Sequence, residues 1–164
     1  YLLSAAARSE RAQRELVFGL IRASERERSS VRQQLLDHYE SFAVAPPKYI
    51  QLLAAISTPR VNYASTWDLF TELPIVAQKN VLSAAANSDR KLYASLLQGT
   101  MVATGDLNGG IDGLFGPATL NAYLRFCPKV TERRLCQRGP FFNQTRAALV
   151  EYIPELLANA DLRQ

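Results

Sequence analysis

Residues 105–127 read GDLNGGIDGLFGPATLNAYLRFC, and no other stretch of the chain is as informative about function. Its first half is rich in glycine, and a helix-compatible run follows directly. We expect Gly109, Gly110 and Gly113 to adopt positive φ, a conformation that residues with a Cβ reach only at a cost. The stretch therefore predicts a tight loop followed by a helix.

The junction between loop and helix carries its own signals. Asp112 precedes a glycine, which is typical of a turn because a short carboxylate can accept a hydrogen bond from its own backbone two residues on. Gly116 and Pro117 predict a helix start, since proline lacks only an N–H that would be unpaired at the first helical position. Thr119 falls in the first turn, where its hydroxyl can meet an unpaired backbone amide. The helix is expected to run to Cys127.

The same residues resemble the small three-helix peptidoglycan-binding domain of bacterial cell-wall proteins. The resemblance is dense over residues 105–126, is far more specific than a lone glycine motif, and says little about the N-terminal half. It implies a non-catalytic module that binds or docks at peptidoglycan. The matching residues are Gly105, Gly109, Ile111, Asp112, Gly113, Phe115, Gly116, Pro117, Thr119, Ala122 and Phe126.

The whole chain is predicted to be all-α, a helical bundle whose C-terminal three-helix unit packs on the preceding helices. We expect an N-terminal helical segment over residues 1–45, connecting helices over 46–87, and the peptidoglycan-binding-like domain over 88–164. Within 46–87, residues 60–73 are expected to be looser than the rest.

Turn and capping residues set the expected helix limits. One helix is predicted over 75–86, with Asn87 as a left-handed stop. Ser88 is expected to cap the next helix, over 89–104, which Gly105 closes.

The remaining helices follow from the resemblance and from apolar spacing. Residues 141–149 align with 115–123 and suggest a weaker second copy of the loop–helix unit. Pro154 is expected to open a last short helix. The helix from Pro117 has a second apolar stripe at Leu120, Leu124 and Cys127, so we expect it to be buried nearly all round.

The net charge of +4 is concentrated in one segment. Residues 125–146 hold six basic side chains against a single acid, Glu132. This excess indicates either a solvated loop face or an anionic partner, such as the carboxylates of peptidoglycan peptide stems. Nucleic acid is not expected, because no helix-turn-helix signature or aromatic stacking platform accompanies the charge.

The two cysteines, Cys127 and Cys136, are expected to form a disulfide if the protein is exported, and to be buried thiols in a reducing compartment. The longest apolar run is too short to span a bilayer. The chain begins at Tyr1 rather than Met. We expect a mature or trimmed fragment that lacks an upstream export signal or anchor, in a periplasmic or secreted protein.

Catalytic patterns are incomplete in this sequence. A single histidine, His38, cannot supply the usual zinc ligands, so no metal and no cofactor are expected. Glu40-Ser41 resembles the start of the catalytic segment of lytic transglycosylases, but the glycine-rich stretch expected downstream is missing. A transglycosylase-like enzyme using Glu40 is therefore kept only as a minor alternative.

Three residues are the candidate ligand contacts. By resemblance the ligand would lie in a shallow groove near the loops, beside Asn108, Asp112 and Arg125. Asn108 offers an amide to a peptide stem, and Arg125 can pair with a carboxylate through two parallel hydrogen bonds. The alternative function is docking to a protein such as a cell-wall enzyme, with the fold kept and no glycan bound.

Overall fold

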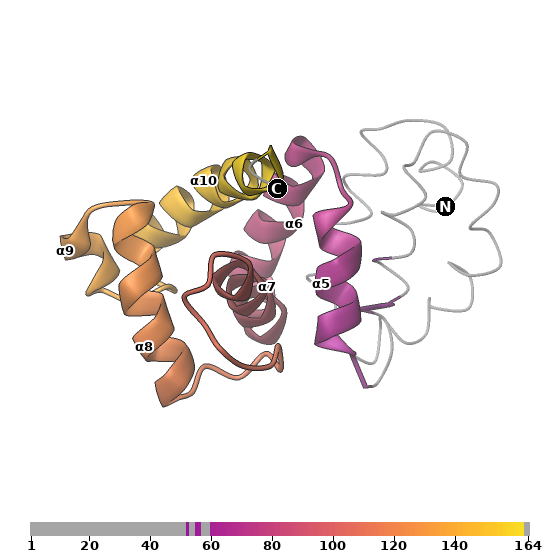
Figure 1. Cartoon of the computed structure of the whole chain (residues 1–164), viewed down its shortest axis with the longest axis horizontal. Coiled ribbons are helices and arrows are strands. Elements are labelled where there is room, and N and C mark those ends of the chain that lie inside the picture. The colour runs from indigo at the N-terminus through magenta and orange to yellow at the C-terminus, as the bar shows by residue number, and fades with distance from the viewer. Residues whose placement is uncertain (1–51, 53–54, 57–59, 163–164) are drawn as a thin grey trace, which may run out of the picture.

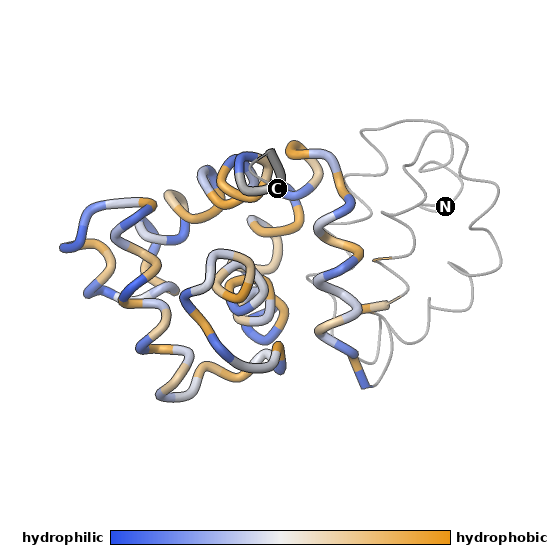
Figure 2. Tube along the Cα trace, in the orientation of Figure 1, coloured by the Kyte–Doolittle hydropathy of each residue, from blue (hydrophilic) through white to orange (hydrophobic). Residues whose placement is uncertain are grey.

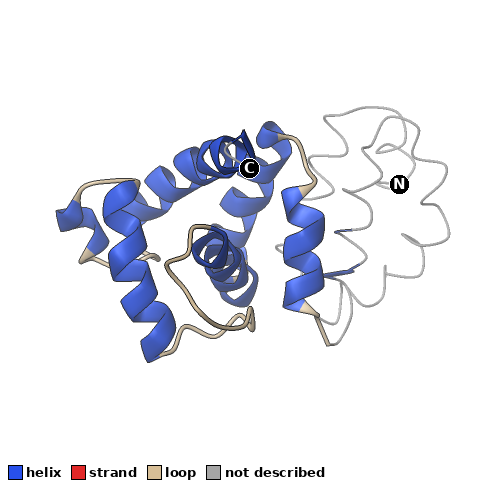
Figure 3. Cartoon of the chain, in the orientation of Figure 1, coloured by secondary structure: helices blue, strands red, loops and turns tan. Residues whose placement is uncertain are grey.

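The structure, a computed structural model, describes residues 52, 55, 56 and 60–162. These residues form helices and loops with no strand among them, as Figure 3 shows. The all-α class is therefore confirmed for this part of the chain. The N-terminal segment over 1–45 and Glu40 lie outside the described residues. The helices are α5 (Tyr63–Thr71), α6 (Ile75–Ser88), α7 (Arg90–Ala103), α8 (Pro117–Phe126), η2 (Cys127–Lys129), α9 (Arg133–Cys136) and α10 (Asn143–Leu162).

Helix α7 lies at the centre of the described fold. It contacts α5, α6, α8 and α10, which surround it in Figure 1. All residues from Leu92 to Met101 are buried. The Ser95 and Thr100 hydroxyls each donate to a carbonyl of the preceding turn, at 2.6 and 2.8 Å. A helix covered on every side can carry such polar groups only when they are paired.

The ends of α7 are set by Asp89 and Gly105. Asp89, and not the expected Ser88, is the N-cap, and its carboxylate accepts from the Leu92 amide at 3.0 Å. Ser88 instead ends α6, which also takes in Asn87, so the predicted left-handed stop is wrong. Asp89 takes this position because its backbone is extended, as an N-cap requires, whereas Ser88 still belongs to α6.

Helix α5 corrects the expectation of a looser segment over 60–73. Asn62 caps it by accepting from the Ser65 amide at 3.1 Å. Trp67 then packs directly on α7, because a Cβ on Gly99 would lie 2.2 Å from the indole ring. Burial of Trp67 and Phe70 holds the helix in place, although its local signals in the sequence are weak.

Helix α10 also differs from the prediction. It runs through Pro154 without a break, whereas a separate short helix was expected. Proline normally disrupts a helix interior. Here Leu149, Ile153 and Leu157 are buried on one face, on both sides of the proline. Their packing against the core keeps the two halves in one helix.

Helix α8 is buried on one face only. Ala122, Tyr123 and Phe126 are fully buried, whereas Leu120 and Leu124 are 43% and 46% exposed. Figure 2 shows apolar and polar residues following one another along this helix. The expectation of burial nearly all round is wrong, because α8 lies at the edge of the fold, with the core on one side of it.

One hydrophobic core joins helices on both sides of residue 88. Helix α10 packs against α6, and Lys79 of α6 pairs with Glu151 and Glu155 at 2.9 and 3.4 Å. The C-terminal helices thus pack on the helices that precede them. The domain limits themselves stay a prediction.

Candidate functional site

Residues 105–116, here called the glycine loop, connect α7 to α8. The loop begins with Gly105 at φ +80°, and the next amide, of Asp106, donates to the Met101 carbonyl at 2.8 Å. This is a Schellman motif, in which a left-handed glycine closes the preceding helix. The loop ends at Gly116, the N-cap of α8, and Pro117 occupies the first helical position as predicted.

The Gln98 side chain fixes the middle of the glycine loop. Its Nε2 donates to Asp112 Oδ1 at 2.9 Å and to the Leu114 carbonyl at 2.8 Å. Thr119 Oγ1 lies 3.2 Å from the same nitrogen. Its Oε1 accepts from the amides of Asp112 and Gly113 at 3.1 and 2.9 Å. Gln98 is 1% exposed, so these bonds replace water at a buried amide.

Asp112 forms the turn that the sequence predicts. Its Oδ1 accepts from the Leu114 amide, two residues on, at 2.9 Å. This bond, followed by the bond from Gln98, lowers the pKa of Asp112. The carboxylate is therefore ionised near neutral pH, and the residue is exposed on the loop.

The glycines of the loop have different roles. Gly113 has φ +76°, and a Cβ there would lie 2.9 Å from the Lys91 carbonyl oxygen. Gly109 and Gly110 do not have positive φ, so the prediction is correct for Gly113 and wrong for the other two. The turn is closed by Asp112 and Gly113, and it needs one left-handed residue.

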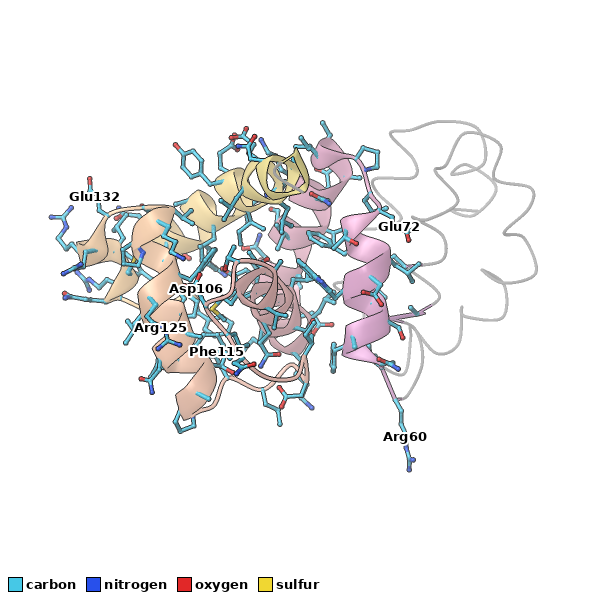
Figure 4. All side chains as sticks on the ribbon, viewed as in Figure 1. Arg60, Glu72, Asp106, Phe115, Arg125 and Glu132 are labelled. Carbon is cyan, nitrogen blue, oxygen red and sulfur yellow. A yellow bond between two sulfur atoms is a disulfide. The ribbon has the colours of Figure 1, made fainter. Side chains whose placement is uncertain are left out.

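Asp106 links the loop to the segment after α8. Lys129 Nζ lies 2.8 Å from both carboxylate oxygens, and the Thr104 hydroxyl donates to Oδ2 at 2.7 Å. Arg125 Nη2 donates to the Asp106 carbonyl at 2.8 Å, and Figure 4 labels both residues. Burial acts to raise the pKa of Asp106, but the hydrogen bonds from Lys129 and Thr104 and the nearby positive charges outweigh it, and the pKa is lowered.

The predicted disulfide is present. Cys127 and Cys136 are bonded, with Cα atoms 5.7 Å apart, and the bond joins η2 to α9. The Tyr123 hydroxyl donates to the Cys136 carbonyl at 3.1 Å. Burial raises the pKa of Tyr123 to about 12, so this phenol stays a donor at physiological pH. The disulfide and the hydrogen bond from Tyr123 thus hold the segment after α8 in place.

The three candidate contacts differ in their surroundings. Asn108 is exposed at the outer part of the glycine loop. Asp112 and Arg125 are exposed too, but both make internal hydrogen bonds that hold the loop. The glycine loop therefore presents to solvent the Asn108 amide, the ionised Asp112 carboxylate and the apolar side chain of Leu114, which is 58% exposed. The role of the three candidate contacts in binding stays a prediction.

Sequence reasoning missed the residues that hold this arrangement. Gln98 directly follows two leucines of the predicted core, and that position was the available signal, because a buried amide needs partners. Asp106 and Lys129 are far apart in the sequence, and they meet because the glycine loop and α8 bring the chain back to the end of α7.

The basic excess over residues 125–146 is partly used inside the fold. Arg125 and Lys129 hold Asp106, and Arg146 Nη1 donates to the Ala86 carbonyl at 2.7 Å. Arg133 and Arg134 remain exposed on α9.

Neither a metal site nor a membrane span is found within the described residues. No group of three or more His, Cys, Asp or Glu side chains there could hold a metal ion. None of the helices there is both long and apolar enough to cross a bilayer.

Comparison with known proteins adds no relative. No family model matches the chain, and it has no significant match among curated proteins or solved structures. The resemblance to peptidoglycan-binding domains therefore depends on residues 105–126 themselves.

Proposed function

We propose that this chain is a non-catalytic extracytoplasmic module that binds peptidoglycan through the outer surface of the glycine loop. The observation that carries the proposal is the rigid, exposed loop built on Gln98. A loop held in one conformation before binding loses little conformational entropy when a ligand arrives.

The chemistry of the loop suits a peptide stem or an amino sugar. The Asn108 amide can both donate and accept, and the exposed carboxylate of Asp112 can accept from amides and hydroxyls. The disulfide supports an extracytoplasmic location, because disulfides persist mainly in oxidising compartments.

Co-sedimentation with purified sacculi tests this function. We expect the protein to be enriched in the pellet, and Asn108→Ala to weaken binding about fivefold, as expected for one lost hydrogen bond. Asn121→Ala is the matched control, because Asn121 is an exposed asparagine on α8 outside the loop. Its binding should stay at the level of the unmodified protein.

Two outcomes of this co-sedimentation assay would contradict the proposal. Absence of the protein from the pellet would contradict peptidoglycan binding. An equal loss for Asn108→Ala and Asn121→Ala would contradict the assignment of the loop as the binding surface.

A second candidate function is docking to another protein, such as a cell-wall enzyme. The observation that favours it is the exposed pair Leu120 and Leu124, one turn apart on α8. Exposed apolar side chains in a cluster are typical of protein interaction sites. Co-purification of a partner from envelope extracts, lost in Leu124→Lys and with sacculi left unbound, would favour this function over the first.

A further inference from the structure

An open pocket of about 560 Å³ lies between α6 and α10. It is away from the glycine loop and uses α6, which precedes the peptidoglycan-binding-like domain. Its volume is within the usual range for small-molecule sites, roughly 300–1,000 Å³. The residues lining it are Ser83, Ala86, Asn87, Asn143, Arg146, Ala147 and Val150.

Arg146 brings a positive charge that no carboxylate in the described residues neutralises. Its Nη1 donates to the Ala86 carbonyl at 2.7 Å, and its Nη2 donates to Asn143 Oδ1. Both acceptors are neutral, and within the described part of the chain this side chain forms no ion pair. The guanidinium is half-buried, so water screens its charge only in part.

The start of α10 adds to this positive potential. Asn143 is the first residue of this long helix, and the first turn leaves backbone N–H groups without intrahelical partners. The helix dipole favours an anion at this end. The Asn143 side-chain amide adds a donor at the wall of the same pocket, and Asn87 Nδ2 keeps one N–H beside the one that it donates to the Ser83 carbonyl at 2.9 Å.

The rest of the wall is small and apolar. Ala86, Ala147 and Val150 offer short apolar side chains against which a small apolar group can pack. We propose that this pocket binds a small organic carboxylate with a short apolar body, such as the C-terminal alanine of a peptide, with Arg146 as the partner of the carboxylate. This site goes beyond the proposed function, because it requires neither the glycine loop nor peptidoglycan.

The test is a titration of the full ¹⁵N-labelled chain with N-acetyl-alanyl-alanine, followed by NMR. We expect saturable shifts of the Arg146 Nε–H signal and of the Asn87 and Asn143 side-chain amides, with a dissociation constant on the order of 1 mM. The same peptide as its C-terminal amide should bind about tenfold more weakly, because a charged acceptor makes the stronger hydrogen bond to a guanidinium.

Three variants separate the pocket from general electrostatics. Arg146→Gln should weaken binding about tenfold. Arg138→Gln removes the same charge from a side chain that lies over the Phe142 ring, 5.0 Å from its centroid, and should leave binding unchanged. Ser83→Leu places a larger side chain in the pocket from α6 and leaves the Arg146 guanidinium in place. We expect this variant to abolish the ligand-induced shifts. If Arg146→Gln does not fold, the result for Ser83→Leu alone tests whether the ligand occupies this pocket.

Several results would overturn the proposal. They are the absence of saturable shifts at Arg146, equal binding of the amide peptide, or binding that survives Ser83→Leu. Equal binding of inorganic phosphate would overturn the assignment to carboxylates. Unchanged sacculus binding by Ser83→Leu would show that this pocket and the proposed function are separate.

Discussion

Gln98 and Asp112 are joined by two hydrogen bonds of opposite direction. Gln98 Nε2 donates to Asp112 Oδ1 at 2.9 Å, and Gln98 Oε1 accepts from the Asp112 amide at 3.1 Å. The central helix therefore fixes both the side chain and the backbone of the turn in the glycine loop.

Replacement of Gln98 should destabilise the protein and free the loop. Gln98→Ala leaves the amides of Asp112 and Gly113 without this acceptor, so we expect the free energy of unfolding to fall by about 3 kcal/mol. Urea denaturation measures this loss. Gln98→Glu is the matched variant, because it keeps an acceptor but removes the donor and faces the Asp112 carboxylate with a like charge. A loss below about 0.5 kcal/mol for both variants would contradict the role given to Gln98.

The two loop glycines Gly113 and Gly109 should respond differently to alanine. Gly113→Ala forces a side chain into a left-handed conformation, which costs about 1–2 kcal/mol, and places its Cβ against the Lys91 carbonyl. Nothing lies within 4 Å of the Cβ position of Gly109. Thermal unfolding of both variants should show a clear loss of stability for Gly113→Ala alone. Equal losses would refute the assigned backbone roles.

The Asp106 carboxylate should make stability depend on acid pH. Its pKa in the folded protein is below the usual value of 3.8, so its stabilising effect is complete above that value. The effect is lost as the pH falls through 3.8 towards the folded pKa. At pH 7 we expect Asp106→Asn to cost about 1–2 kcal/mol, because Lys129 is half exposed to water. The difference between variant and unmodified protein should shrink in acid, and a constant difference down to low pH would contradict this link.

Reduction of the disulfide should loosen the segment after α8. The Cys127–Cys136 bond closes a short loop, and its removal is expected to cost about 2.5 kcal/mol in the chain-entropy model. Unfolding curves with and without a reductant measure this cost, and a Cys127→Ser, Cys136→Ser double variant controls for effects of the reductant. Identical curves for the oxidised and reduced protein would show that the bond adds no stability.

Local signals correctly predicted the turn at Asp112 and Gly113 and the start of α8. Asp112, Gly113, Gly116 and Pro117 behave as expected because each acts on its own backbone or on the next few residues. These effects need no knowledge of the rest of the fold.

Tertiary contacts explain where the predictions are wrong. Helix α5 depends on the place that Gly99 leaves for Trp67, and α10 passes Pro154 because buried residues on both sides hold it. The second apolar stripe predicts a buried face, yet of its residues only Cys127 is buried. Leu120 and Leu124 are exposed because α8 lies at the edge of the fold. A sequence pattern shows that a residue is apolar but not whether a neighbour covers it.

The most direct test of the proposed function follows the loop amides during ligand binding. The ¹⁵N-labelled protein is titrated with soluble peptidoglycan fragments released from sacculi by enzymatic digestion, and the amide spectrum is recorded at each step. We predict saturable shifts for the amides of residues 108–114, weakened in Asn108→Ala and unchanged in Asn121→Ala. Shifts confined to other surfaces, or no shifts at all, would contradict recognition of peptidoglycan by the glycine loop.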